Sequence, residues 1–141
     1  MVELSRDDCL DLLASQRFGR LAVVLDGAPL IRPVNYVFDR QTQSVVFRTA
    51  RGSKLHALLH AAKASFEIDG IDGCTRTGWS VLIQGVTVEV SRPHDIGHLN
   101  SLGLAPWAPG SRTHWVRVRA LTVSGRQIAL PVEPAPGRYL G

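Results

Sequence analysis

The sequence is poor in several features that would each indicate a different class of protein. Only 6% of its 141 residues are aromatic, and it has two cysteines. No apolar run approaches the roughly eighteen residues that a membrane-spanning helix needs, and there are no internal repeats or low-complexity tracts. We therefore expect one soluble domain, long enough to bury its own core but too short for two.

The N-terminus lacks the pattern of a secretory signal. It reads MVELSRDDCLDLL, with acidic residues where such a signal has a basic start followed by an apolar stretch. Without export, Cys9 and Cys74 are expected to stay reduced, because disulfides are rare in the cytoplasm. We expect a cytoplasmic protein.

Motifs of nucleophilic catalysis and of nucleoside-triphosphate binding are also missing. The chain has no GxSxG elbow and no GxxxxGK loop, and neither cysteine lies in a recognisable nucleophile motif. No residue stands out as an obligatory acid or base, so catalytic residues stay unassigned.

Positive charge is in moderate excess, and almost all of it is arginine. There are 16 Lys and Arg against 12 Asp and Glu, a net charge of +4. The planar guanidinium of arginine suits phosphate and carboxylate recognition. The arginines are scattered through strand-like segments and form no basic stripe interleaved with aromatic residues, which argues against nucleic-acid binding. The pattern indicates local anion sites.

Apolar segments of short length predict six strands. Asp26-Gly27 is typical of a tight hairpin between the first two, and Pro33 places the second strand at an edge or a bulge, because proline cannot donate to a ladder. In the longest strand the apolar alternation changes phase at Gly85, which predicts a β-bulge and a sharp bend. The expected strands cover residues 20–25, 29–38, 44–49, 63–69, 79–91 and 114–125.

Three segments carry helical signals. Ser5 and Ser53 are good N-caps followed by apolar residues at helical spacing, and a short helix can open at Ser91 with Pro93 in its first turn. Strands outnumber helices and no βαβ alternation appears. We therefore expect a mainly β protein, a small antiparallel barrel or strongly curved sheet with flanking helices.

The stretch RTARGSKLHALLH, residues 48–60, carries the strongest signal of a site. A strand end, Gly52 and the N-cap Ser53 bring free backbone amides and the positive end of a helix dipole to one point, which favours anion binding. The alternative is a solvated turn whose cations complement acids elsewhere. The cations and the hydroxyl around this point are Arg48, Thr49, Arg51 and Lys54.

Arg32 and Asn35 lie in the neighbouring predicted strand on opposite faces, since they are separated by an odd number of residues. An arginine in an apolar strand is costly unless paired, so Arg32 is a candidate second phosphate or acid contact. Equally, it can be an edge-strand cation that discourages aggregation. In a proline-flanked loop further along the chain, the ring of Trp107 can cover a flat ligand.

Two histidine pairs have the i, i+4 spacing of a metal clamp on a helix, His56 with His60 and His94 with His98. No Glu, Asp or Cys stands at an obvious completing position near either pair. The favoured interpretation is half-exposed helix residues, and no metal site is assigned.

The order of the predicted strands and helices along the chain resembles that of the flavin-binding split-barrel family typified by pyridoxamine 5'-phosphate oxidase, especially its smaller bacterial members. The resemblance covers about residues 4–128 and is carried by IRPVNYVFD, VVFRTARGSKL and WSVLIQGVTVEVS. It implies a six-stranded antiparallel split β-barrel of Greek-key type over residues 1–128, with an irregular tail at 129–141. It also implies a homodimer with one flavin in each of two interface clefts.

The same resemblance implies a set of cofactor contacts. The residues at the strand end and helix start would hold the FMN phosphate, the preceding strand would run beside the isoalloxazine ring, and residues of the long strand would reach the flavin from the partner subunit. Late aromatic and basic residues would close the pocket. The implied set is Arg32, Pro33, Val34, Asn35, Arg48, Thr49, Ser53, Lys54, Ser80, Gln84, Trp107 and Arg112.

The implied function is an FMN-dependent oxidoreductase acting on a small molecule. Vitamin B6 oxidation is not expected, because the chain ends in PVEPAPGRYLG and does not match the C-terminal extension that binds pyridoxal phosphate in true pyridoxamine-phosphate oxidases. One alternative is an F420-dependent reductase on the same fold, for which Arg51 and Arg112 would supply extra cations. Another is a binding protein for flavin or haem without turnover.

Overall fold

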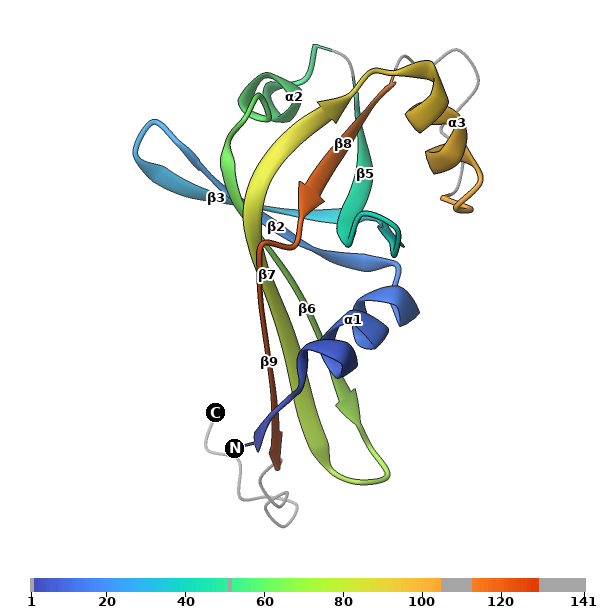
Figure 1. Ribbon diagram of the computed structural model, residues 1–141. Coiled ribbons are helices and arrows are strands. Elements are labelled where there is room, and N and C mark those ends of the chain that lie inside the picture. The colour runs from blue at the N-terminus through green and yellow to red at the C-terminus, as the bar shows by residue number, and fades with distance from the viewer. Residues whose placement is uncertain (1, 51, 105–112, 130–141) are drawn as a thin grey trace.

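The computed structural model describes residues 2–50, 52–104 and 113–129, and within them the chain is mainly β (Figure 1). The three helices are α1 (Arg6–Ser15), α2 (Lys54–Leu58) and α3 (Pro93–Asn100). The strands are β1 (Val2–Glu3), β2 (Phe18–Leu25), β3 (Ala28–Asn35), β4 (Val37–Asp39), β5 (Ser44–Ala50), β6 (Lys63–Asp72), β7 (Thr77–Val90), β8 (Thr113–Arg119) and β9 (Thr122–Ala129).

The strands form one strongly curved antiparallel sheet in the order β3-β2-β6-β7-β8-β5-β4, with β9 pairing both β1 and β7. The long strand β7 organises the sheet, because β9 pairs its first part and β8 its last part. The ends of the path, β3 and β4, do not pair in the described residues, so the sheet is open. The mainly β prediction is confirmed, whereas the predicted count of six strands is wrong, since the described residues alone form nine.

Two of the extra strands arise because a predicted strand is interrupted at a residue whose backbone N–H donates to a carbonyl outside the paired strands. The segment predicted over 29–38 divides at Tyr36, whose N–H donates to the Arg17 carbonyl at 3.0 Å. The segment predicted over 114–125 divides at Ala120, whose N–H donates to the Gln43 carbonyl at 2.9 Å. The ninth strand, β1, is two residues long and has no sequence signal of its own.

Gly85 marks the bend of β7 but not a bulge in its pairing with β6. The β6–β7 ladder runs without interruption from Lys63↔Val86 to Asp72↔Thr77, so the predicted bulge is wrong for this ladder. A Cβ at Gly85 would lie 2.1 Å from the Arg119 carbonyl oxygen. Glycine therefore lets the corner between β8 and β9 lie directly against β7, where β7 changes partner.

The main core lies between α1 and the sheet. Leu13 of α1 and Phe66 of β6 are both completely buried. Tyr36 packs edge-on against Phe66, with ring centroids 4.8 Å apart, and its hydroxyl donates to the Leu13 carbonyl at 2.7 Å. Ser5 caps α1 as predicted, accepting from the Asp8 N–H at 3.1 Å. Cys9 of α1 is a free, buried thiol, and burial raises its pKa.

Helix α3 covers a second, smaller core and is tied to the sheet by a buried carboxylate. Asp39 is 1% exposed, with one oxygen 3.1 Å from His98 Nε2 and the other accepting from Thr42 Oγ1 at 2.9 Å. Burial alone would raise the pKa of Asp39, but the hydrogen bonds from His98, Thr42 and the Gln41 N–H outweigh it and lower the pKa. The helix begins at Pro93, with Arg92 at its cap position, one residue later than predicted.

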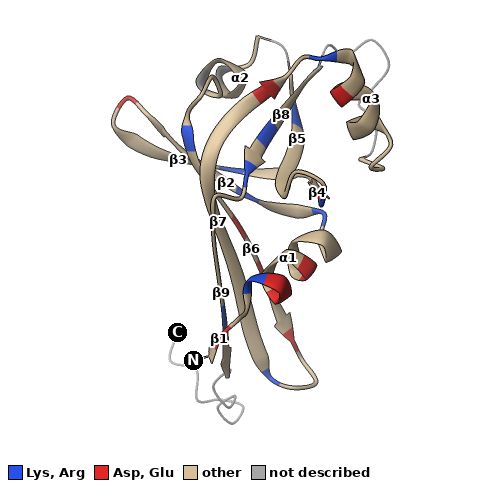
Figure 2. Cartoon of the chain, viewed as in Figure 1, with Lys and Arg blue, Asp and Glu red and all other residues tan. Residues whose placement is uncertain are grey.

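Basic residues are spread over several strands and connections in Figure 2, which agrees with the absence of a basic stripe in the sequence. Among the helices that the structure describes, none has both the length and the apolar character to cross a membrane.

Candidate functional site

A pocket of about 400 Å³ lies where β5 ends, the chain turns into α2, and β3 passes alongside. Its volume falls within the range of small-molecule sites, roughly 300–1,000 Å³. Half of the residues predicted to contact a cofactor meet here: Pro33, Val34, Asn35, Arg48, Thr49 and Ser53.

The turn into α2 has the geometry that the sequence predicts. The Ser53 N–H donates to the Ala50 carbonyl at 3.2 Å, and Gly52 between them has a φ of +78°. Ser53 is the N-cap of α2, its Oγ accepting from the His56 N–H at 3.0 Å. Because this bond uses Ser53 as an acceptor, its own O–H remains able to donate into the pocket.

Arg48 supplies an unsatisfied donor to the pocket wall. Its guanidinium lies over the ring of Trp115, 4.3 Å from the centroid, in a cation–π contact between paired positions of β5 and β8. Its Nε is buried and has no hydrogen-bond partner among the described residues. Buried donors in native proteins are nearly always satisfied. Arg48 also lines the pocket, so its positive charge lies beside any phosphate or carboxylate bound there, and the donor set fits an oxyanion.

Thr49 joins the pocket to a neighbouring histidine. The threonine is 2% exposed, lines the pocket, and its Oγ1 lies 2.9 Å from His56 Nδ1. Its hydroxyl donates into the pocket only when His56 Nδ1 carries the proton and donates to Thr49.

The sequence predictions missed the apolar part of the wall, which Ala50, Leu55 and Leu104 form. Leu55 follows the N-cap by two residues, a position that the helix prediction could have placed near the site. Leu104 follows α3 and carries no such signal. These side chains give the pocket an apolar surface beside its donors.

Several other predicted residues do not join this pocket. Arg32 is exposed on β3, with Nη1 3.5 Å from the carbonyl of its neighbour Ile31, and it does not line the pocket. Lys54 opens α2, but its side chain lies outside the described structure. Trp107 and Arg112 also lie outside the described residues.

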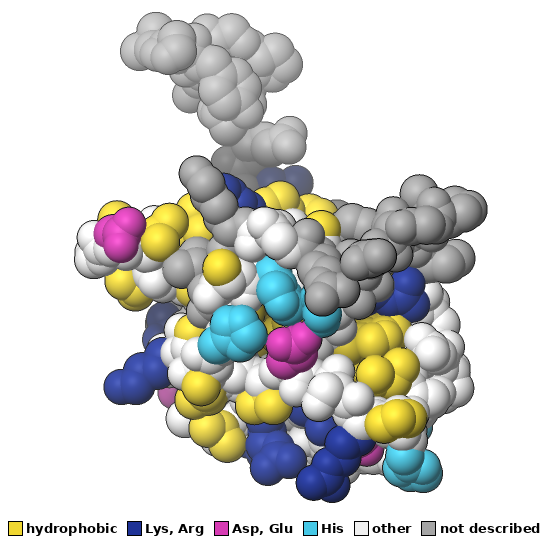
Figure 3. All heavy atoms as spheres, turned by 90° about the horizontal axis from the view of Figure 1, so that it is seen from above, with side chains coloured by type: hydrophobic (Ala, Val, Ile, Leu, Met, Phe, Trp, Pro, Cys, Tyr) yellow, Lys and Arg dark blue, Asp and Glu magenta, His cyan; other side chains and the backbone are white. Residues whose placement is uncertain are grey.

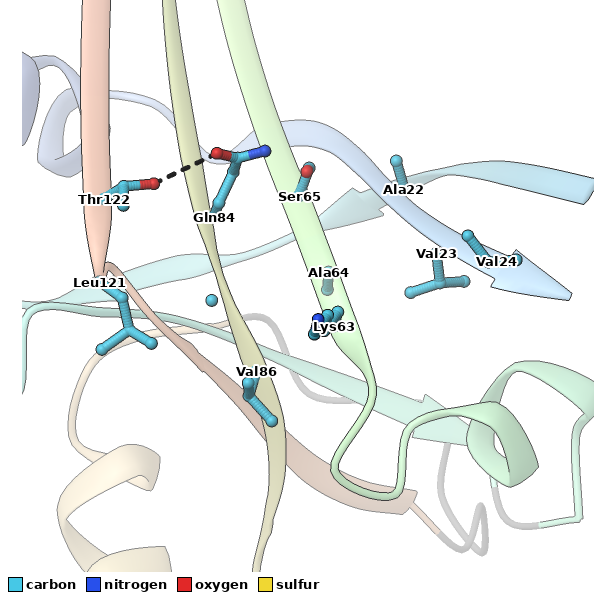
Figure 4. Close-up of a pocket in the computed structure, with 11 residues that line it drawn as sticks. Ala22, Val23, Val24, Lys63, Ala64, Ser65, Gln84, Val86, Leu121 and Thr122 are labelled. Atoms are coloured by element: carbon cyan, nitrogen blue, oxygen red, sulfur yellow. Dashed lines mark hydrogen bonds between the residues drawn. The ribbon is translucent and has the colours of Figure 1, made fainter. Parts of the chain in front are cut away.

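Ser80 and Gln84 lie on the face of β7 that points away from the core, since the buried residues are Val81 and Ile83. Gln84 borders a shallow hollow of about 520 Å³ on this face. Figure 4 shows Gln84 accepting from Thr122 Oγ1, a contact of 3.3 Å. The structure thus places these two residues on a different surface from the pocket within one chain.

The outer hollow is mostly apolar. Figure 4 shows side chains from β2, β6, β7 and the corner before β9 around it. Val24 is 66% exposed and Leu121 is 61% exposed, and Ala22 and Val86 also border the hollow. Its one charged lining residue is Lys63, within the part of the chain that the structure describes.

Fold and pocket together define a class of protein: a mainly β domain built on an open, curved antiparallel sheet, with an oxyanion-suited pocket at a strand end. A sequence model of pyridoxamine 5'-phosphate oxidase matches residues 5–127. The chain belongs to this family, as the resemblance in its sequence predicts.

Similar proteins cover nearly the whole chain. An uncharacterised protein of Mycobacterium tuberculosis is 34% identical over 134 residues, which are 91% of this chain and 86% of that protein. The solved structure of an FAD-binding protein from Mycobacterium smegmatis is 35% identical, with a TM-score of 0.80, and covers 90% of this chain and 99% of that chain. A conserved protein of unknown function from Corynebacterium diphtheriae is 34% identical, with a TM-score of 0.79, and covers 92% of this chain and 98% of that chain.

Proposed function

We propose that the pocket at the start of α2 binds a flavin, with FMN as the cofactor, and that the protein is a flavin-dependent oxidoreductase. The observation that carries this proposal is that the cation Arg48, the hydroxyl of Thr49 and the capping residue Ser53 line one pocket at the start of α2. The FAD-binding protein at 35% identity supports a flavin as the ligand class.

In this proposal the two sides of the pocket have different roles. Ser53, Thr49 and the amides at the start of α2 donate to the phosphate, and Arg48 adds a charge-assisted hydrogen bond. Val34, Leu55 and Leu104 exclude water from the flat ring, and Pro33 and Asn35 lie beside them on the pocket wall.

A bound flavin supplies the hydride or electron transfer, and the protein supplies binding and orientation. The described lining residues include no Asp, Glu or His. This chain's own contribution is therefore to fix the phosphate end and to shield the ring, which agrees with the lack of an obligatory acid or base in the sequence.

We also propose that the protein is a homodimer formed through the outer face of the sheet. Water-exposed Val24 and Leu121 and the nearly uncharged hollow between them support such a contact, because burying exposed apolar area favours association. Ser80 and Gln84 lie on that face, so a partner subunit could receive them. Light scattering should give twice the mass of one chain, and Val24→Glu should shift the protein towards the monomer.

A titration of flavin-free protein tests the cofactor proposal. FMN, FAD and riboflavin are added separately, and quenching of flavin fluorescence gives each dissociation constant. FMN should bind, and riboflavin, which lacks the phosphate, should bind more than tenfold more weakly, a difference above about 1.4 kcal/mol. Equal binding of riboflavin and FMN would contradict the phosphate assignment, and no binding of any flavin would contradict the proposal.

Adding F420 to this titration, together with an assay of reduction of the bound flavin, distinguishes the alternatives. Tighter binding of FAD than of FMN would support a flavin-dependent function but identify FAD, not FMN, as the cofactor. Tighter binding of the deazaflavin F420 would favour the F420-dependent alternative. A bound flavin that no electron donor reduces faster than free flavin would indicate a binding protein without turnover.

A further inference from the structure

Three histidines and a glutamate gather on the surface beside α2, from three separate parts of the chain. His56 lies in α2, His60 follows it, Glu89 lies in β7 and His114 in β8. Figure 3 shows a group of histidine side chains around an acidic one on this face. One ligand atom each of His56, His60 and Glu89 lies within 4.8 Å of the others.

The contacts within the group orient two of these side chains. Thr49 Oγ1 lies 2.9 Å from His56 Nδ1, and His56 Nε2 lies on the side of Glu89. His114 Nδ1 lies 2.5 Å from Glu89 Oε1, leaving Oε2 towards His56. The rings of His56 and His114 are stacked, with centroids 4.2 Å apart. His56 and Glu89 therefore each have one polar atom in contact with a neighbouring side chain, and the other polar atom faces the centre of the group.

The central distance is not that of a hydrogen bond. His56 Nε2 and Glu89 Oε2 are 4.0 Å apart, which is too long for a direct N–H···O bond. Adjacent ligand atoms around a tetrahedral zinc ion are roughly 3.3 Å apart, given metal–ligand bonds of about 2.0–2.1 Å. Side-chain movements of about one ångström would thus bring the three ligand atoms onto one ion.

We propose that His56, His60 and Glu89 bind a divalent transition-metal ion, zinc in the first instance. Two imidazole nitrogens and one carboxylate oxygen form a ligand set that zinc commonly takes, with a fourth position open to water. Thr49 and His114 are positioning residues: they hold His56 and Glu89 through the atoms that do not face the ion, as outer partners of metal ligands do.

The site is accessible to an ion from solution. His60 is exposed, and the side chains of His56 and Glu89 are 15% and 27% exposed. The ligands come from α2, the residues after it and β7, so the folded chain brings them together before any ion binds. This proposal is separate from the flavin proposal, and it can be tested without any flavin.

Zinc titration of the metal-free protein tests the site. Protein without any purification tag is treated with a chelator, and Zn²⁺ is added in a calorimeter. We expect one Zn²⁺ per chain. His60→Ala removes an exposed ligand and should weaken binding at least tenfold without unfolding the chain. Glu89→Gln should do the same while keeping the shape of the side chain.

His94→Ala is the matched control, because His94 is also an exposed histidine and lies in α3, outside the group. It should leave Zn²⁺ affinity unchanged. Co²⁺ in place of Zn²⁺ should give visible absorption bands that His60→Ala abolishes and His94→Ala retains. Stoichiometry well below one ion per chain, unchanged affinity in His60→Ala, or equal weakening by His94→Ala would each overturn the proposal. Circular dichroism of each variant confirms that it is folded before the titration.

Discussion

Replacing Arg48 by methionine should separate ligand binding from folding more sharply than any other single change in the pocket. Methionine keeps an unbranched, flexible apolar stem that can still pack on Trp115, but it removes the guanidinium. In the flavin-free protein the Nε of Arg48 has no hydrogen-bond partner among the described residues. Replacing Arg48 therefore removes no hydrogen bond made by this atom. The cation–π contact at 4.3 Å from the Trp115 ring is worth about 2 kcal/mol at a largely buried site, where Trp115 is 6% exposed.

The bound state should respond more strongly. If Arg48 donates to the flavin phosphate, its removal costs one charge-assisted hydrogen bond, about 1.5–3 kcal/mol. This corresponds to a rise in the FMN dissociation constant of roughly 10- to 150-fold. The free energy of unfolding should fall by no more than about 2 kcal/mol.

Both quantities can be measured on the same preparation, by fluorescence titration with FMN and by urea unfolding without it. Arg92→Met serves as control, because Arg92 is exposed at the start of α3, away from the pocket. It should change neither quantity. A variant Arg48→Met that loses stability by several kcal/mol and binds FMN as the unchanged protein does would refute the reasoning, because Arg48 would then be a structural residue.

Three further results are expected. Gly85→Ala should destabilise the fold by at least about 2–3 kcal/mol in urea unfolding, because its Cβ would lie 2.1 Å from the Arg119 carbonyl oxygen; stability within 0.5 kcal/mol would contradict this packing. Because the pKa of Asp39 is lowered in the folded state, the stability it contributes should be present above its unfolded pKa of about 3.9 and be lost as pH falls through the lower folded value. Asp39→Asn should therefore unfold more easily at pH 7 than the unchanged chain, with the difference shrinking below pH ~3.5 in acid titrations. Zn²⁺ should tighten FMN binding several-fold, and by linkage FMN should tighten Zn²⁺ binding by the same factor, since an ion on His56 keeps the proton on Nδ1 and leaves the Thr49 hydroxyl free to donate; an FMN affinity that Zn²⁺ leaves unchanged would contradict a shared Thr49.

The sequence predicts those features that depend on near neighbours in the chain. Ser5 and Ser53 were recognisable as caps because each precedes a helical apolar pattern, and both accept the expected N–H. The alternation of β3 puts Arg32 and Asn35 on opposite faces, and of these two candidates only Asn35 lines the pocket. Such features follow from local geometry, so one short segment is enough to predict them.

Features that depend on tertiary contacts could not be predicted in this way. The breaks at Tyr36 and Ala120 result from hydrogen bonds to Arg17 and Gln43, which no apolar pattern reveals. In β7, the apolar alternation after Gly85 includes Val88, which is 54% exposed, whereas the polar Thr87 is completely buried. The strand that pairs with β7 changes from β9 to β8 along its length. The face of β7 that is buried changes with it.

The proposed zinc site likewise depends on tertiary contacts that the sequence pattern does not reveal. The spacing of His56 and His60 suggested a clamp, but α2 ends at Leu58, so the expected helix does not extend to His60. The missing acidic ligand, Glu89, lies 29 positions along the chain from His60. It reaches the group only because β7 pairs with β8 beside α2. A local search for a completing residue therefore had to fail.

The segment from Thr49 to His60 contributes to both proposed sites. Ser53 and Leu55 line the pocket, whereas His56 is directed to Glu89, and Thr49 contacts both. A variant at His60 should therefore lose zinc while keeping FMN in zinc-free buffer, and a variant at Arg48 should lose FMN while keeping zinc. If both variants instead lost both ligands, the common cause would be collapse of the turn at Gly52, and neither set of contacts could then be credited with binding on its own.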